Sequence, residues 1–330
     1  MLSLAGRSVL VTGAGGFIGG HVVERLVNDG ARVRALCRYN SRNERGTLDW
    51  LAPEVTADVE VILGELRDVE SVSDAVAGMD VVIHLGAQIA IPYSYVNPRD
   101  FIEVNVLGTL NVAEAARRHG VARVVHTSTS EVYGSAQTVP MTETHPLEPQ
   151  SPYAASKLAA DKLIDSYHRS FDLPACVVRP FNTYGPRQSA RAIIPTIISQ
   201  ALAGSTLRLG SLTPRRDLTF AADTAAGFVA AATAEDAVGR TIQLGANHDV
   251  SVGDLVRLVG EVLGRELTVE TDSRRVRPEA SEVVRLISGP FLAEEVLGWR
   301  AEVPLHEGLA QTIAWMERNA ERYRASDYVI

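Results

Sequence analysis

Cysteine is scarce in this sequence, because only Cys37 and Cys176 occur among 330 residues. Two thiols cannot build a disulfide framework, and no Cys/His spacing typical of a zinc site is present, so we expect no metal site. Long apolar runs are missing too. No stretch approaches the roughly 18 apolar residues that a membrane-spanning helix needs, and the N-terminus lacks the pattern of a secretory signal. The sequence therefore predicts a cytoplasmic protein with no membrane partner and two reduced, buried thiols.

An excess of basic residues is also absent. The sequence has 32 Lys and Arg against 40 Asp and Glu, a formal net charge of −8. This balance argues against a protein that binds nucleic acid through a general basic surface, although a local basic pocket for a phosphate remains possible. With 46% hydrophobic and 22% charged residues, the composition is that of a globular protein and not of a disordered chain.

Short apolar runs alternate with segments of helical periodicity over the first 180 residues. Strands are expected at 8–12, 32–37, 59–63, 80–85, 123–128 and 174–179, and helices at 17–28, 69–77, 97–119 and 152–171. This alternation predicts an α/β fold, a Rossmann-type doubly wound parallel sheet with helices on both faces. From Pro180 onward the elements shorten, which indicates a smaller mixed α/β lobe. We expect residues 1–180 and 217–245 in the dinucleotide-binding domain, and 181–216 and 246–330 in the lobe.

A glycine-rich turn follows the first expected strand. Gly13, Gly16 and Gly19 are spaced three apart, and Phe17 and Ile18 open the next helix. Glycine at these places allows a tight turn, a close approach of backbone N–H groups to a pyrophosphate, and close packing of helix on strand. The N-terminus of that helix favours an anion. We therefore expect these five residues to bind a dinucleotide cofactor.

The end of the second expected strand bears on the choice of cofactor. An acidic residue there would bind the adenosine ribose hydroxyls and favour NAD. This sequence has Cys37 followed by Arg38, and a guanidinium suits a 2′-phosphate. The cofactor is therefore expected to be NADP or NAD, with a slight preference for NADP through Arg38.

Tyr153 and Lys157 form a Tyr-x-x-x-Lys pair near the start of an expected helix. Residues four apart share one helix face, so the phenol and the ammonium are expected side by side. A neighbouring ammonium lowers the pKa of a phenol, and the resulting tyrosinate could take a proton from a substrate hydroxyl.

Three polar residues, Thr129, Ser130 and Glu131, follow the strand expected at 123–128. Ligands of open parallel sheets bind at the carboxyl ends of the strands, so we expect these side chains in the cleft beside Tyr153. Thr129 could hydrogen-bond a substrate oxygen. Glu131 could remove a C–H proton that an adjacent ketone has made acidic.

Together with these motifs, His84-Leu85-Gly86-Ala87 and the run at 179–187 resemble the extended short-chain dehydrogenase/reductase superfamily over nearly the whole chain. Within it, the sequence is most similar to the NAD(P)-dependent nucleotide-sugar 4,6-dehydratases. Residues 38–43, 88–95, 188–195 and 209–217 resemble the subgroup that acts on GDP-N-acetylglucosamine in legionaminic acid biosynthesis. The fold and the reaction of this family are therefore expectations for this chain.

The resemblance implies roles for individual residues. Tyr153 would be the base at the sugar C4 hydroxyl, Lys157 would hold the nicotinamide ribose, Thr129 would bind O4 and Glu131 would abstract the C5 proton. The implied reaction is oxidation at C4, loss of water across C5 and C6, and return of hydride to C6, with the cofactor tightly retained. The resemblance also implies cofactor contacts for Leu85, Ala87 and Pro180, and nucleotide-sugar contacts for Asn182, Arg187, Pro195, Arg216 and Arg277. A homodimer through helices 97–119 and 152–171 is expected by analogy.

The sequence departs from the family pattern at several places, among them the end of the second strand described above and Gly86, where alanine is common. Ser130 stands where glucose-type dehydratases have an aspartate that protonates the C6 hydroxyl, so either Glu131 acts as both base and acid or a water relays the proton. Glu65 replaces the usual aspartate after the third strand, which weakens the expected adenine contact. UDP-glucuronate decarboxylase, nucleotide-sugar 4-epimerase and a cofactor-binding regulator without catalytic activity remain alternatives.

Overall fold

The computed structural model describes residues 3–273, 283 and 285–323. In this part of the chain, seven parallel strands form the central sheet, in the order β10-β6-β5-β4-β1-β2-β3. The strands are β1 (Ser8–Thr12), β2 (Arg32–Arg38), β3 (Val59–Gly64), β4 (Val81–His84), β5 (Arg123–Thr127), β6 (Ala175–Pro180) and β10 (Thr241–Leu244). The predicted Rossmann-type doubly wound sheet is confirmed. Its first six strands along the chain begin and end within a residue or two of the predicted bounds, whereas β10 was not predicted as a strand.

Alternate residues of each strand pack on opposite faces of this sheet. In β1, Val9 and Val11 belong to a core that α1 and α9 cover, whereas Leu10 belongs to a core under α3, α6 and α7. The helices on the first face are α1 (Phe17–Asn28) and α9 (Ala221–Thr233), and those on the second are α3 (Val69–Val76), α6 (Gly108–His119) and α7 (Pro152–Phe171). Because both faces are covered, the inner strands β1 and β4 are buried along nearly their whole length, whereas β2 and the edge strand β3 keep the charged residues Arg34 and Glu60.

The predicted single helix at 97–119 is divided in the structure. It consists of α5 (Pro98–Phe101), a π-helical segment η2 (Ile102–Leu107) and then α6. Asn105 lies within the π segment and donates its side-chain amide to Ser156 Oγ at 2.9 Å on α7. Such π segments often mark functional sites, and here the extra residue joins this helix to the helix that carries Tyr153.

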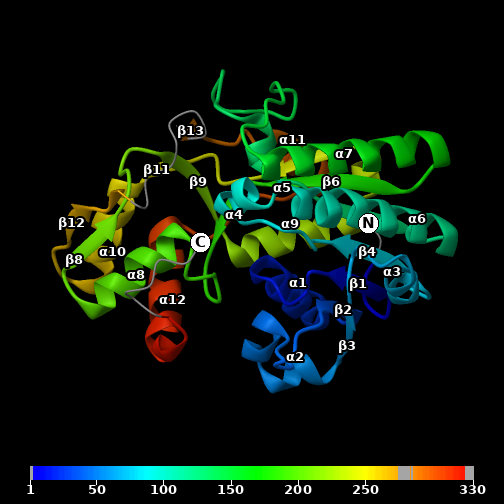
Figure 1. The fold of residues 1–330 in the computed structure, drawn as a ribbon, viewed down its shortest axis with the longest axis horizontal. Coiled ribbons are helices and arrows are strands. Elements are labelled where there is room, and N and C mark those ends of the chain that lie inside the picture. The colour runs from blue at the N-terminus through cyan, green and yellow to red at the C-terminus, as the bar shows by residue number, and fades with distance from the viewer. Residues whose placement is uncertain (1–2, 274–282, 284, 324–330) are drawn as a thin grey trace.

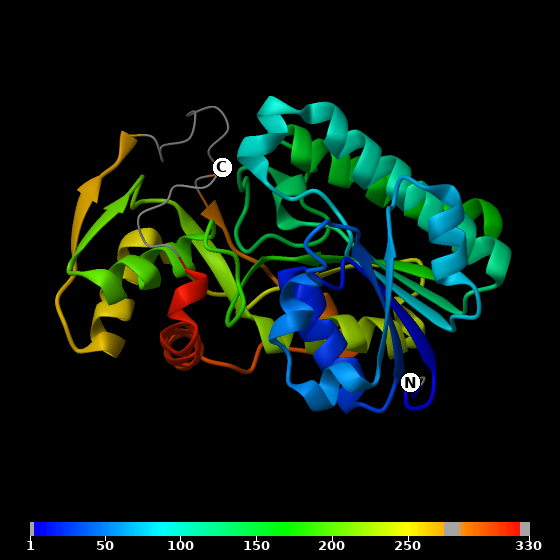
Figure 2. The same ribbon diagram turned by 60° about the horizontal axis from the view of Figure 1, so that its bottom comes forward.

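The smaller lobe lies beside the carboxyl ends of the central strands (Figures 1 and 2). Its sheets combine β7 (Asn182–Tyr184), β9 (Arg215–Phe220), β11 (Asp249–Ser251) and β13 (Arg285–Leu286), and separately β8 (Thr206–Leu209) and β12 (Thr268–Thr271). Helices α8 (Ile193–Ala203), α10 (Val252–Leu263) and α12 (Leu305–Arg318) share one apolar core with these strands. Figure 1 shows these three helices gathered at the left, away from α6 and α7.

Two parts of the expected domain division differ from the structure. Helix α11 (Phe291–Leu297) was expected in the lobe, but Ala293, Leu297 and Trp299 pack into the core of the central sheet with α9 and β10. Residues 217–220 were expected in the dinucleotide domain, but they lie in β9, which pairs with β7, β11 and β13. Both differences arise from long-range packing that local periodicity does not encode.

The remaining helical segments are short. Between β2 and β3 lie η1 (Gly46–Trp50) and α2 (Pro53–Ala57), and α4 (Ile91–Val96) follows β4. The 3₁₀ segments η3 (Ser130–Tyr133), η4 (Glu235–Ala237) and η7 (Ala320–Arg322) complete the description. Among the described residues, no helix has the length and apolar character to span a bilayer.

Candidate functional site

A cleft of about 870 Å³ lies where the carboxyl ends of the central strands face the smaller lobe. Its size is in the range of ligand-binding cavities. Fifteen residues singled out in the sequence line it: Gly13, Gly16, Phe17, Ile18, Gly19, Arg38, Leu85, Ala87, Thr129, Glu131, Tyr153, Lys157, Pro180, Asn182 and Arg216. Residues from both lobes therefore converge on one cavity, at the sheet edge where open α/β folds bind their ligands.

The glycine turn forms one wall of the cleft and leaves no room for side chains. Gly13 has φ +67°, and a Cβ there would lie 2.7 Å from the backbone of Gly86. The first turn of η1 supports the glycine turn, because Thr47 donates its N–H to Gly15 O at 2.9 Å and its hydroxyl to Gly16 O at 2.7 Å. This cradle of close-packed backbone fits the pyrophosphate of a dinucleotide.

We predict that Gly13→Ala destabilises the protein and abolishes cofactor binding. An alanine in this left-handed backbone conformation costs about 1–2 kcal/mol. In addition, the new Cβ would clash with the backbone of Gly86. Gly78→Ala is the matched control, since Gly78 has φ +76° but nothing lies within 4 Å of its Cβ position. Thermal unfolding and cofactor titration would measure the difference, and equal losses in the two variants would contradict the steric argument.

Tyr153 and Lys157 lie on the first two turns of α7, which Ser151 caps by accepting a hydrogen bond from Ala154 N at 3.1 Å. Both side chains are buried, at 8% and 3% exposure. Burial raises the pKa of Tyr153 to about 12, although a hydrogen bond with Thr129 acts in the opposite direction. Burial also lowers the pKa of Lys157 to about 8. Removal from water therefore acts against the acidic phenol that the sequence predicts.

The polar run after β5 divides between cleft and core. Thr129 caps η3, accepting a hydrogen bond from Glu131 N at 3.3 Å, and both Thr129 and Glu131 line the cleft. Ser130 is buried at 3% exposure and does not line it. Glu131 is thus the carboxylate that the run presents beside Tyr153, whose pKa it raises further.

Two expected contact residues, Arg187 and Pro195, lie outside the cleft. Arg187 has φ +70° and bonds Glu24 at 2.5 Å and His21 Nδ1 at 2.7 Å, so it joins the lobe to α1 instead of lining the cleft. Pro195 is buried in the first turn of α8 and does not line the cleft either. Arg277 lies outside the described residues.

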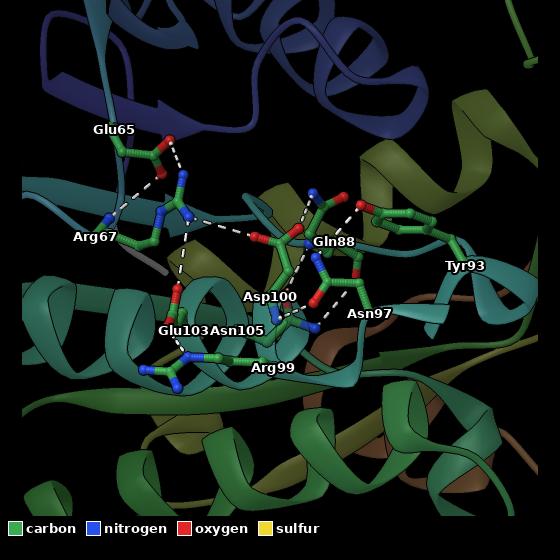
Figure 3. A network of polar contacts seen from close by, with 9 residues as sticks. All are labelled: Glu65, Arg67, Gln88, Tyr93, Asn97, Arg99, Asp100, Glu103 and Asn105. Carbon is green, nitrogen blue, oxygen red and sulfur yellow. Dashed lines mark hydrogen bonds and ion pairs between the residues drawn. The ribbon is translucent and has the colours of Figure 1, made fainter. Parts of the chain in front are cut away.

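A polar network that the motifs did not reveal forms the edge of the cleft (Figure 3). Arg67 Nη2 lies 3.1 Å from Glu65 and Nη1 lies 3.4 Å from Asp100. Gln88 Nε2 donates to Asp100 at 2.7 Å, and the Asn105 side chain bonds both backbone groups of Gln88. Glu65, Arg67, Gln88 and Asp100 all line the cleft. The sequence pointed to Glu65 as the residue after the third strand and to Gln88 within the resembling stretch 88–95, whereas no motif indicated Arg67 or Asp100.

Comparisons with known proteins agree with this geometry. The family model for GDP-mannose 4,6 dehydratase matches residues 10–312. The chain is 33% identical to a UDP-glucose 4-epimerase of Mycolicibacterium smegmatis, over 94% of this chain and 99% of the relative. It is 31% identical to a dTDP-glucose 4,6-dehydratase of the same organism, over 96% and 95% of the two chains.

A solved structure is similarly close. The dTDP-glucose 4,6-dehydratase DesIV from Streptomyces venezuelae, a double mutant with NAD and DAU bound, superposes with a TM-score of 0.86 at 29% identity. The match covers 96% of this chain and 98% of that one. The family match over most of the chain, together with these full-length similarities, confirms the resemblance seen in the motifs. The chain belongs to the GDP-mannose 4,6 dehydratase family of the extended short-chain dehydrogenases/reductases.

Proposed function

We propose that this protein is a nucleotide-sugar 4,6-dehydratase that retains a nicotinamide dinucleotide between turnovers. One observation carries the proposal: Thr129, Glu131, Tyr153 and Lys157 line the same cleft as the glycine turn. A hydroxyl, a phenol and an ammonium suit oxidation at a sugar carbon. The additional carboxylate suits proton abstraction at the neighbouring carbon, which an epimerase does not require.

The residues divide the chemistry between them. Tyr153 takes the proton of the C4 hydroxyl while Thr129 holds that oxygen, and the resulting 4-keto group acidifies C5–H. Glu131 removes the C5 proton as the C6–O bond breaks, and water leaves. The bound dinucleotide would supply the hydride acceptor for C4–H and would return that hydride to C6. The proton that Tyr153 took from O4 passes through solvent and Glu131 to C5, so Tyr153 is regenerated, the product is a 4-keto-6-deoxy sugar and the net oxidation is zero.

The proton for the departing C6 hydroxyl comes from Glu131 in this proposal. Ser130 cannot supply it from the core, since its side chain does not reach the cleft. Glu131 gains a proton from C5 in the same step. In its protonated form it can then donate that proton to the leaving hydroxyl. One carboxylate acting in both roles requires no further acid.

The direct test is incubation of the purified protein, without added cofactor, with UDP-, GDP- and dTDP-linked hexoses and N-acetylhexosamines. Mass spectrometry should find a product lighter by one water. Release of carbon dioxide from UDP-glucuronate would indicate a decarboxylase instead. No conversion of any of these substrates, together with no reduction of bound cofactor, would support a regulator without catalytic activity.

A nucleotide-sugar 4-epimerase is the second candidate. The 33% identity to a UDP-glucose 4-epimerase favours it, because the two chains match over nearly their whole lengths. An epimerase would return the hydride to C4 and would leave Glu131 without a chemical role. A product inverted at C4, with no loss of water, would establish this alternative.

The choice between NAD and NADP depends on Arg38 in our proposal. Arg38 is exposed at the end of β2 and lines the cleft, whereas Arg42 pairs with Glu44 at 3.2 Å and Arg45 with Asp49 at 2.7 Å. We predict that Arg38→Ala weakens NADP binding by about tenfold, the loss of one charge-assisted hydrogen bond, and leaves NAD binding nearly unchanged. Titration of the cofactor-free protein measures this. Arg42→Ala is the matched control, and equal weakening of both cofactors by Arg38→Ala would contradict the preference for NADP.

The nucleotide of the substrate is expected at the lobe side of the cleft. Asn182, Arg191 and Arg216 line it there, and two guanidinium groups suit a diphosphate. Arg191 replaces Arg187 in this proposal, because Arg187 is engaged with α1. The proposed substrate is an NDP-hexose or an NDP-N-acetylhexosamine bound in this cleft.

We further propose a homodimer in which α6 and α7 pair with the same helices of a second copy. These two helices lie side by side (Figure 2). Ile102 and Leu107, in η2 just before α6, and Phe171, at the end of α7, are exposed. Burial of such side chains against a symmetry-related face is a common basis of dimerisation. A cytoplasmic location and the absence of a nucleic-acid partner stay predictions from the sequence.

A further inference from the structure

Helix α7 carries a third ionisable residue in line with Tyr153 and Lys157. Asp161 follows Lys157 by four positions, so all three side chains lie on one helix face. Asp161 is buried at 1% exposure and does not line the cleft. A fully buried carboxylate is unfavourable unless other groups compensate its charge, so its surroundings require an explanation.

Two strands supply partners for this carboxylate. Ser128 Oγ at the end of β5 donates to Asp161 Oδ2 at 2.7 Å, and Arg179 of β6 donates from Nη2 at 3.0 Å and from Nε at 3.2 Å. The second oxygen, Oδ1, lies 3.4 Å from His126 Nε2, and neither atom has a hydrogen-bond partner among the described residues. Oδ2 is therefore fully engaged, whereas Oδ1 is buried without a hydrogen bond.

The charges around Lys157 show what this carboxylate can do. His84 of β4 and His126 of β5 are neutral near pH 7, because burial lowers the pKa of His126 to about 4 and that of His84 well below its usual range. Arg179 of β6 is cationic. Burial disfavours ionisation of Asp161, but His126, Arg179 and Ser128 outweigh it and hold its pKa below the usual value. Asp161 is thus a buried anion that is paired directly with Arg179 and lies one helical turn from Lys157.

We propose that Asp161 is a positioning residue that acts as the buried counter-ion of Lys157, so that an ammonium and not a neutral amine stands beside Tyr153. This inference rests on the proposed roles of Tyr153 and Lys157. Arg179 and Ser128 fix the carboxylate to β5 and β6, and the carboxylate in turn fixes the charge state of the lysine one helical turn away.

The protonation of Lys157 is close enough to neutral pH for this to matter. Burial lowers its pKa to about 8, and Asp161 is the group that opposes this shift. Removing the negative charge lowers the lysine pKa further, so that the amine loses its proton nearer pH 7. The same change removes an anion that raises the pKa of Tyr153. Both effects move the pH optimum in the acid direction.

The test compares the pH dependence of turnover in the holoenzyme for the wild type, Asp161→Asn and Asp161→Glu. We expect the alkaline limb of the profile to move by roughly one pH unit toward acid in Asp161→Asn, from the loss of one charge about one helical turn away. Asp161→Glu keeps the charge and should keep the limb near its wild-type position. Asp165→Asn is the matched control. It is the same substitution one turn further along α7, at a residue that pairs with Lys162 at the surface.

A purely structural Asp161 gives a different result. Turnover would then fall by the same factor at every pH and the limb would stay in place, which would overturn the proposal. If Asp161→Asn does not fold, titration of the Lys157 amine in the folded wild type replaces it: a protonated amine at pH 7 is expected, and a neutral amine would overturn the proposal. The product formed by the wild type tests the proposed function separately. An epimerase reaction would also use Tyr153 and Lys157, so its pH profile would show the same alkaline limb.

Discussion

Replacement of Tyr153 by phenylalanine should reduce turnover by about 10²–10⁴-fold, the usual contribution of a positioned acid–base group. The phenylalanine ring occupies the same space, since Tyr153 packs edge-to-face on Phe101 with ring centroids 6.3 Å apart. The change removes the hydroxyl and its hydrogen bond with Thr129. Stability should therefore fall by only about 1 kcal/mol. Product formation measured by mass spectrometry, with thermal unfolding beside it, separates the two effects.

The control for this variant lies on the same helix. Tyr167→Phe removes a phenol that donates to Glu114 at 3.3 Å on the outer side of α7, away from the cleft. It should leave turnover near that of the wild type. If Tyr153→Phe kept turnover within tenfold of the wild type, Tyr153 would not be the base at C4.

Replacement of Glu131 by glutamine should stop the reaction after its first half. The amide cannot accept the C5 proton, so dehydration should fall by about 10²–10⁴-fold while oxidation at C4 continues through Tyr153. The bound cofactor should then accumulate in its reduced form in the presence of substrate. The near-ultraviolet absorbance of the reduced cofactor measures this accumulation. In deuterated solvent, the sugar should take up no deuterium at C5.

Glu148→Gln provides the matched control, because Glu148 is exposed and does not line the cleft. It should form product at the wild-type rate with no accumulation of reduced cofactor. Formation of product by Glu131→Gln at the wild-type rate would assign proton abstraction to another residue. Loss of both half-reactions would instead indicate that Glu131 is needed for substrate binding.

Local patterns in the sequence predicted the parts of the fold that depend on local periodicity. The strand at Ser8–Thr12 and the helix at Phe17–Asn28 have the predicted bounds, because an apolar run ending in glycine and a 3.6-residue spacing are both properties of neighbouring residues. The Tyr153/Lys157 pair belongs here as well, since four residues of helix bring the two side chains to one face.

Residues far apart in the chain decided the remainder of the site. Ser130 and Glu131 are adjacent, yet one faces the core and the other the cleft, and no periodicity separates them. Arg187 resembles a substrate contact in sequence but meets Glu24 across the lobe boundary. Asp161 gains its significance from Ser128 and Arg179 on two different strands.

The sequence by itself determined the alternation of strands and helices, the glycine turn and the candidates for the reacting groups, because each follows from residue type and short-range spacing. The tertiary structure alone decided which of those groups reach the cleft, and how strongly burial shifts the pKa of Tyr153 upward and that of Lys157 downward. Desolvation depends on everything packed around a side chain, and that environment exists only once distant segments have come together.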